Sequence, residues 1–196
     1  MRYSQLIEAQ ATDIAVFYGG RFQPMHSGHY QVYMDLVRKF GSSNVFIATM
    51  VGKNASPEKD PFNFNEKAMI MNKMFNIPTA NIINTMPYKP DIAATGKDPN
   101  NTAVVVVFSE KDAGRLQAGK YFRMYKDGEQ LATSDEAGYI YTVPVKDDGR
   151  SATTFRNAMR MEDLGEEEKQ RVFQDFFGNF NPEVYKFIKD KLNAGI

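Results

Sequence analysis

The sequence predicts an α/β protein with a mainly parallel sheet, because short apolar runs alternate with helical patterns along the chain. Three runs have strand length and are apolar almost throughout, which is typical of strands buried on both faces: residues 14–18, 44–51 and 102–108. Gly19 and Gly20 end the first run, and a helical pattern begins at Tyr30. Strand, glycine turn and helix together form the first half of a βαβ unit.

At 196 residues, with 42% hydrophobic and 24% charged residues, the chain has the size and composition of one globular domain. We expect an N-terminal extension over residues 1–12 and a single domain over 13–196. Lysine plus arginine equals aspartate plus glutamate, 24 each, so no basic field indicates a nucleic-acid partner. The chain has no cysteine, which excludes disulfides, and no apolar run reaches the roughly 20 residues that span a bilayer. We therefore expect a soluble, cytoplasmic protein without a membrane partner.

The other elements follow from apolar spacing and from turn residues. A second helix is predicted after Pro61, and a short third strand covers residues 81–84. The polar loop 93–101 is expected to be exposed and to act as a lid. Residues 166–177 have an amphipathic helical pattern, and Pro182 opens a last helix. Helices therefore close the chain.

A β-hairpin insertion is predicted between residues 120 and 145. The triplet Lys126-Asp127-Gly128 is a turn signal of the kind that joins antiparallel strands. The apolar run 139–143 follows it. We expect the hairpin to lead into the last strand of the sheet and to shape a ligand pocket or a subunit contact.

The only two histidines of the chain stand at the start of the predicted first helix. His26 and His29 are three residues apart, with Gly28 between them and Arg21 just upstream. The N-terminus of a helix attracts anions, because its first N–H groups have no partner within the helix. Two imidazoles and a guanidinium at such a point indicate a phosphate site. The alternative is that both histidines are ordinary loop and helix-start residues.

A second cluster, Ser151, Thr153 and Arg156, lies far downstream of the first. Ser151 is suited to cap a helix, and Arg156 on its second turn reaches the same anion with a planar fork of donors. Taken alone, such a serine is more often only a helix cap. Together with the first cluster, it predicts the second wall of one anion site.

The first cluster resembles the H-x-G-H signature of the nucleotidyltransferase superfamily, here His26-Ser27-Gly28-His29. The longer string G-R-F-Q-P-M-H-S-G-H, residues 20–29, is most similar to the archaeal-type nicotinamide mononucleotide adenylyltransferases and their bifunctional bacterial relatives. Residues 150–156 resemble the second signature of the superfamily, I-S-S-T-x-x-R, with Ser151, Thr153 and Arg156 matching. The similarity runs from the first strand to the C-terminus and is weakest over 113–146. It implies a Rossmann-like three-layer αβα fold, which here carries the hairpin insertion and the C-terminal helices.

The resemblance implies nucleotidyl transfer, in which AMP moves from ATP to nicotinamide mononucleotide and gives NAD and pyrophosphate. His26, His29 and Arg156 are the expected catalytic residues, because they can donate hydrogen bonds to charge that develops on the triphosphate. The expected nucleotide-binding residues are Gly19, Gly20, Arg21, Phe22, Gln23, Gly28, Ser151, Thr153 and Thr154. Mg²⁺ is expected on phosphate oxygens, without a protein ligand. Small nucleotides are the expected partners, and a homo-oligomer is left open.

Three departures from the family pattern bear on these expectations. The chain has no tryptophan, the residue that in the family commonly stacks on the nicotinamide ring, so Tyr88 or a phenylalanine is the expected stacking platform. Asp91 belongs to a proline-aspartate stretch that in the family helps to form the mononucleotide pocket. Lys67 stands where the family has arginine, either in a phosphate or structural role or as a solvated first-turn residue. Arg150 replaces the aliphatic residue that opens the second signature. Alternatives are an adenylyl- or cytidylyltransferase that acts on phosphopantetheine or on a phospho-alcohol.

The first residues favour a different class of protein. Their opening resembles the capsid-targeting segments of internal head proteins of large tailed phages, and Leu6-Ile7-Glu8 resembles the maturation-protease site of those proteins. This implies a phage head-associated protein that retains the fold and is packaged in the head. A short amphipathic helix is the other interpretation of the segment.

Overall fold

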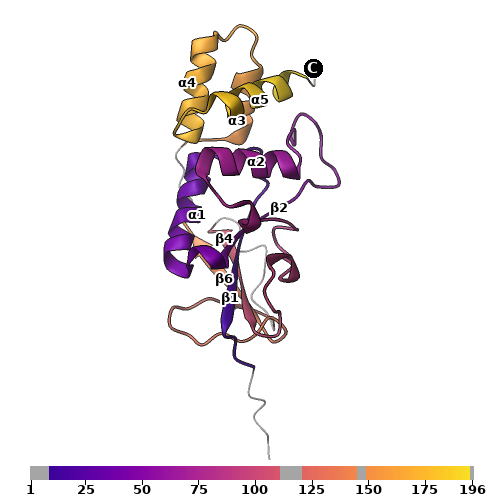
Figure 1. The fold of residues 1–196 in the computed structure, drawn as a ribbon, viewed down its shortest axis with the longest axis vertical. Helices are drawn as coiled ribbons and strands as arrows, with labels where there is room; N and C mark the ends of the chain where they lie inside the picture. Colours follow the sequence, from indigo (N-terminus) through magenta and orange to yellow (C-terminus); the bar gives the residue numbers. More distant parts are fainter. Residues whose placement is uncertain (1–8, 111–120, 145–148, 195–196) are drawn as a thin grey trace, which may run out of the picture.

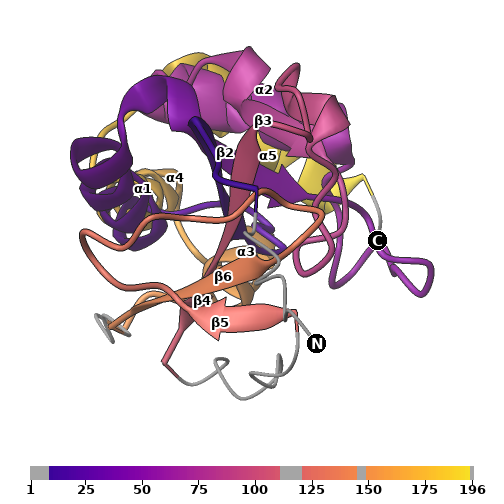
Figure 2. The same cartoon turned by 90° about the horizontal axis from the view of Figure 1, so that it is seen from below.

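The computed structural model describes residues 9–110, 121–144 and 149–194, which form a three-layer α/β fold (Figure 1, Figure 2). Within these residues the central sheet has six strands in the order β3-β2-β1-β4-β6-β5, and every pair of neighbours is parallel. The strands are β1 (Asp13–Gly19), β2 (Val45–Thr49), β3 (Ile82–Asn84), β4 (Thr102–Ser109), β5 (Phe122–Met124) and β6 (Gly138–Val143). The predicted α/β fold with a parallel sheet is confirmed.

The α-helices of the described residues are α1 (Ser27–Phe40), α2 (Phe64–Phe75), α3 (Ala152–Arg160), α4 (Glu166–Phe177) and α5 (Pro182–Asn193). The last three form a group at one end of the molecule, beyond α2, in which α3 contacts both α4 and α5 (Figure 1). The predicted C-terminal helices are therefore present. They lie beyond the carboxyl end of β1, which is the end of a parallel sheet where ligands bind.

Both faces of the sheet are buried, because side chains alternate along each strand. Val16 and Tyr18 of β1 belong to a core cluster that includes Leu36 of α1, Met71 of α2 and Phe155 of α3. Their neighbours on β1 and β4 point the other way, into a smaller cluster that Ile92 completes from the segment after β3. Burial on both faces explains why these strands are apolar almost throughout.

The expected β-hairpin between residues 120 and 145 is wrong, because β5 and β6 run parallel to each other. The turn itself exists, and Gly128 has a φ of +76°. After this turn the chain does not return along β5. Instead it pairs with the segment before β1, through Ala11 N–H to Leu131 O at 2.9 Å and Thr133 N–H to Ala9 O at 2.9 Å. The local turn signal was correct, and long-range pairing decided the direction of the next strand.

The loop 93–101 does not line the cavity described below and is tied to the opposite end of the sheet. Lys97 Nζ donates to both carboxylate oxygens of Asp13, at the start of β1, over 2.7 and 2.8 Å. The expected role of this loop as a lid is therefore wrong for the arrangement observed. The predicted protease site over residues 6–8 lies outside the described residues. No helix of the described ranges is long and apolar enough to cross a membrane.

Candidate active site

A cavity of about 530 Å³ opens at the carboxyl ends of β1, β4 and β6, between the N-termini of α1 and α3. Both sequence clusters meet there. Eleven of the predicted site residues line it: Gly19, Gly20, Arg21, Phe22, Gln23, His26, Gly28, His29, Tyr88, Thr153 and Arg156. The fold thus brings together two clusters that lie far apart in sequence.

The atoms packed against the turn after β1 leave no room for a side chain at Gly19 or Gly20. A Cβ atom on Gly19 would lie 2.6 Å from Pro87 O, and one on Gly20 would lie 2.5 Å from the ring of Phe22. Phe22 has a φ of +45°, which is uncommon for a residue with a side chain. The turn therefore brings Pro87, and the adjacent Tyr88, against the end of β1.

Both histidines take part in capping α1. His26 is the N-cap, and its Nδ1 accepts from Gly28 N–H at 3.1 Å, while His29 Nδ1 accepts from His26 N–H at 3.4 Å. The ring centroids lie 3.7 Å apart. This reciprocal arrangement starts α1 at Ser27, earlier than the predicted Tyr30.

The caps also fix the tautomer of each ring. A neutral imidazole has one acceptor nitrogen and one donor nitrogen. Because Nδ1 of His26 and of His29 accepts a backbone N–H, the ring proton of each must be on Nε2. Two N–H donors therefore stand at the entrance of α1, on side chains that line the cavity.

Arg156 is a buried cation without a carboxylate partner among the described residues. Only 5% of its surface is exposed. Nη1 donates to Gln23 O at 2.6 Å, Nη2 donates to Thr153 Oγ1 at 3.4 Å, and the buried Nε has no hydrogen-bond partner within the described ranges. Burial, together with the charges of Arg160 and Arg21, lowers the pKa of Arg156. A buried guanidinium of this kind is suited to an anionic ligand.

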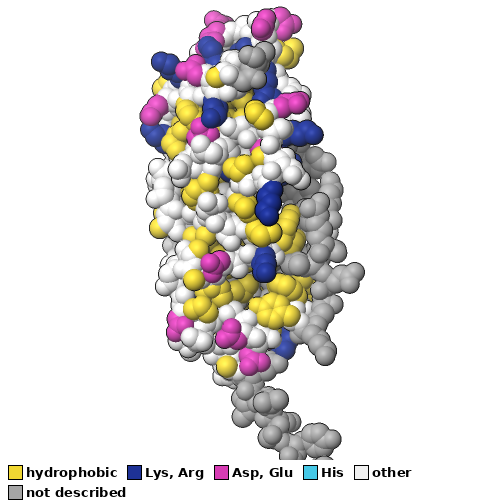
Figure 3. Space-filling view, turned by 90° about the vertical axis from the view of Figure 1, so that its right-hand side faces the viewer, with side chains coloured by type: hydrophobic (Ala, Val, Ile, Leu, Met, Phe, Trp, Pro, Cys, Tyr) yellow, Lys and Arg dark blue, Asp and Glu magenta, His cyan; other side chains and the backbone are white. Residues whose placement is uncertain are grey.

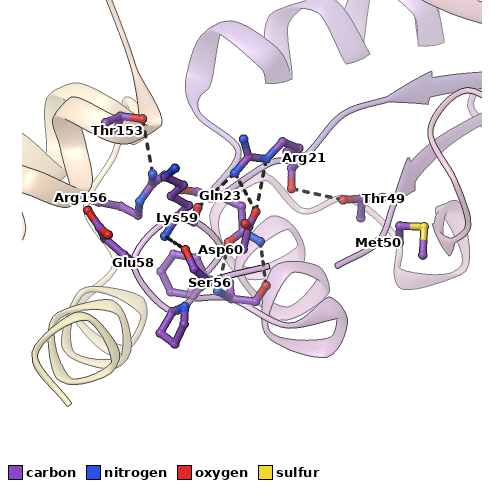
Figure 4. A network of polar contacts seen from close by, with 12 residues as sticks. Arg21, Gln23, Thr49, Met50, Ser56, Glu58, Lys59, Asp60, Thr153 and Arg156 are labelled. Carbon is purple, nitrogen blue, oxygen red and sulfur yellow. Dashed lines mark hydrogen bonds and ion pairs between the residues drawn. The ribbon is translucent and has the colours of Figure 1, made fainter. Parts of the chain in front are cut away.

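Arg21 also lines the cavity, but a carboxylate holds it in this structure. Its Nη2 lies 2.8 Å from Asp60 Oδ1, and its Nε donates to the same oxygen at 3.3 Å (Figure 4). Asp60 belongs to the loop that precedes α2. Phosphate binding by Arg21 would therefore compete with this ion pair.

Gln23 connects three segments of the site. Its side-chain amide exchanges two hydrogen bonds with the backbone of Phe62, over 2.9 and 3.0 Å, and its carbonyl oxygen accepts from Arg156. Figure 4 shows it between Arg21 and Arg156. The side chain of Gln23 thus bonds to the protein backbone at Phe62. The backbone carbonyl of Gln23 positions Arg156.

Lys67 is buried, with 1% of its surface exposed, so its interpretation as a solvated first-turn residue is wrong. Nζ donates to Arg21 O at 3.1 Å, to Thr49 Oγ1 at 2.8 Å and to Met50 O at 3.1 Å. The lysine therefore ties the loop that carries Arg21 to the end of β2. Burial lowers the pKa of Lys67 to about 8.

This burial predicts a pH-dependent difference in stability between the wild type and Lys67→Met. The folded pKa of Lys67 lies below that of an unfolded lysine, near 10.4, so between the two values the unfolded chain binds more protons. The free energy of unfolding of the wild type is therefore expected to rise relative to the variant from about pH 8 upward, by up to roughly 3 kcal/mol. Urea unfolding of both proteins at several pH values measures this difference in the free energy of unfolding. Parallel pH profiles would contradict the lowered pKa.

The remaining predicted residues are placed as follows. Tyr88 stacks on Phe108 with ring centroids 5.2 Å apart and planes within 10°, and it lines the cavity. Ser151, Thr154 and Asp91 do not line it. Ser151 Oγ accepts from Thr154 N–H as the cap of α3, and Asp91 Oδ1 accepts from Ala93 N–H. These three have local backbone roles in the structure.

Sequence reasoning did not assign several residues that line the cavity. They are Tyr18, Pro24, Val32, Val107, Phe108, Val143, Pro144, Arg150 and Ala152. Position at the carboxyl end of a buried strand was the available signal for those at the ends of β4 and β6. Arg150 was noted only as a departure from the family pattern.

No cluster of three His, Asp or Glu side chains within the described ranges could hold a metal ion. The described lining residues of the cavity also include no carboxylate. The cavity therefore offers donors to anions, through imidazole, guanidinium and helix N-termini.

Charged side chains of both signs are scattered over the face in Figure 3, without a broad basic stripe.

Residues 17–158 match the family described as cytidylyltransferase-like. This match spans well over half of the chain, which therefore belongs to the cytidylyltransferase-like family of nucleotidyltransferases. Among solved structures, the fold is similar to that of a bifunctional NMN adenylyltransferase/ADP ribose pyrophosphatase from Francisella tularensis, determined in complex with AMP and a Mn ion. The identity is 18% and the TM-score 0.53, over 93% of this chain and 52% of that one, so this chain spans about half the length of that protein. No curated protein is similar enough to give a match.

Proposed function

We propose that the protein transfers the adenylyl group of ATP to nicotinamide mononucleotide, giving NAD and pyrophosphate. The observation that carries this proposal is the convergence of two imidazole donors and a buried arginine without a carboxylate partner among the described residues. The G-R-F-Q-P form of the first motif favours the nicotinamide acceptor. The bifunctional relative in fold is itself an NMN adenylyltransferase.

In the proposed reaction an oxygen of the acceptor phosphate attacks the α-phosphorus of ATP. A new P–O bond forms, the bond to the β-phosphate breaks, and pyrophosphate leaves with its electron pair. The Nε2–H groups of His26 and His29 would donate to oxygens on which negative charge builds. Arg156, and Arg21 after release from Asp60, would clamp the phosphates in line.

Mg²⁺ would enter with the nucleotide. Magnesium keeps several waters and is usually held by substrate phosphates and few protein groups, which fits a cavity whose described lining has no carboxylate. The metal would neutralise charge on the leaving phosphates. The side chains of this chain would then position the nucleotide and stabilise the remaining charge.

Pyrophosphate release by the purified protein tests the proposal. The assay would contain Mg²⁺ with ATP or CTP, and as acceptors nicotinamide mononucleotide, nicotinate mononucleotide, phosphopantetheine or a phospho-alcohol. We expect release only with ATP and a pyridine mononucleotide. Release with CTP and a phospho-alcohol would instead favour the cytidylyltransferase alternative. A protein that binds ATP and releases nothing would favour the head-associated alternative.

Tyr88 is proposed to hold the acceptor ring in place of the missing tryptophan. The tyrosine is 39% exposed and is backed by Phe108, so it can offer a planar surface in the cavity. Tyr88→Ala is expected to raise KM for the acceptor about tenfold and to leave KM for ATP within about twofold, because stacking contributes about 1–3 kcal/mol. Tyr88→Phe should behave as the wild type. Equal effects on both substrates would contradict the assignment.

A further inference from the structure

Arg150 also lines the cavity, beside the residues that the proposed reaction uses. It directly precedes Ser151, the N-cap of α3. Its Nε donates to Asp175 O at 3.0 Å, near the end of α4. A backbone carbonyl of the C-terminal helices therefore holds this exposed side chain at the wall of the cavity.

The surroundings of Arg150 are suited to an anion. Arg156, on the second turn of α3, is buried, and its Nε has no hydrogen-bond partner in the part of the chain that the structure describes. Thr153, between the two arginines in sequence, accepts from Arg156 Nη2 and also lines the cavity. An anion at the start of α3 would thus meet Arg156 on its inner side and Arg150 on its outer side, together with the positive end of the helix.

We infer that Arg150 binds the terminal phosphates of the nucleoside triphosphate, and hence also the pyrophosphate product. This inference rests on the proposed function. The two histidines stand at the start of α1, where the α-phosphate would react. The leaving phosphates then extend away from the acceptor towards α3, where Arg150 can bind them with a charge-assisted fork.

Binding measurements separate this role from others. Calorimetric titrations, all with Mg²⁺, would use ATP, AMP, inorganic pyrophosphate and nicotinamide mononucleotide. Arg150→Gln is expected to weaken ATP and pyrophosphate binding about tenfold and to leave AMP and mononucleotide binding within about twofold, which is the loss of one charge-assisted contact. Arg150→Lys should recover part of the loss, because it keeps the charge without the fork.

Arg171→Gln is the matched control, because Arg171 is an exposed arginine of α4 that does not line the cavity. It should bind all four ligands as the wild type does. Unchanged ATP and pyrophosphate binding by Arg150→Gln would overturn the inference, as would a loss confined to the mononucleotide or shared equally by AMP. In these cases a wild type that binds ATP and releases pyrophosphate still supports the proposed function. A wild type that binds neither ATP nor pyrophosphate would overturn both.

Discussion

Replacement of Arg156 by methionine is expected to lower kcat/KM by about 10³-fold while the protein stays folded. The guanidinium is the most buried cation of the cavity, and none of the described carboxylates pairs with it. Its loss removes a preorganised charge from the phosphates in a site partly shielded from water. Steady-state kinetics with ATP and the acceptor identified by the assay measure the effect.

The stability of Arg156→Met distinguishes a functional from a structural role. Losing the hydrogen bond to Gln23 O destabilises the fold, whereas removing a buried charge whose pKa is lowered by burial stabilises it. Because the two effects oppose each other, we expect Tm to change by no more than about 4 °C. Arg160→Met, one turn further along α3, is the control and should retain activity, since Arg160 contacts carbonyls of the loop before α2. A large loss of Tm in Arg156→Met with activity retained per folded molecule would refute the catalytic role.

The second large effect on turnover is expected when either of the two histidines is replaced. His29→Ala should lower kcat by about 10²-fold or more, because one charge-stabilising donor is lost. His29→Gln is the sharper variant. Glutamine at the third helical position can still accept from the N-cap N–H, as in a capping box, so the start of α1 is kept while the imidazole is removed.

The capping role and the proposed catalytic role of His26 can be separated in the same way. Asparagine is among the best N-cap residues, so His26→Asn should keep the cap to Gly28 N–H and lose the ring donor. Both conservative variants are expected to have near wild-type Tm and a kcat lowered by about 10²-fold. Thermal unfolding and single-turnover kinetics of the pair measure the two roles separately. Full turnover in His29→Gln would limit that histidine to capping.

Much of the fold was predictable because its signals are local. The strands β1 and β4 are apolar almost throughout, and Ser151 and Pro182 mark helix starts that the structure contains. The direction of β6 was not predictable. It depends on pairing of residues 131–133 with the segment before β1, which is distant in sequence, and the turn at Gly128 gives no information about that contact.

The site was predictable as two motifs but not as a network. Their residue types indicated an anion site, and both motifs line one cavity. The partners were not predictable, because each depends on long-range geometry. Arg21 pairs with Asp60, and Lys67 is buried against carbonyls, although its sequence neighbours resemble those of a solvated residue. The spacing of apolar and polar residues along the chain cannot show which charged side chain the fold buries.

The hydrogen bond between Arg156 and Gln23 has a consequence for how the protein is made. One partner belongs to the first turn after β1 and the other to α3, which is synthesised much later. A nascent chain that ends before α3 lacks one wall of the cavity, although its first strands can already pair. A nucleotide stabilises only states that bind it, so the nucleotide of the proposed reaction can assist folding only after α3 has left the ribosome and packed.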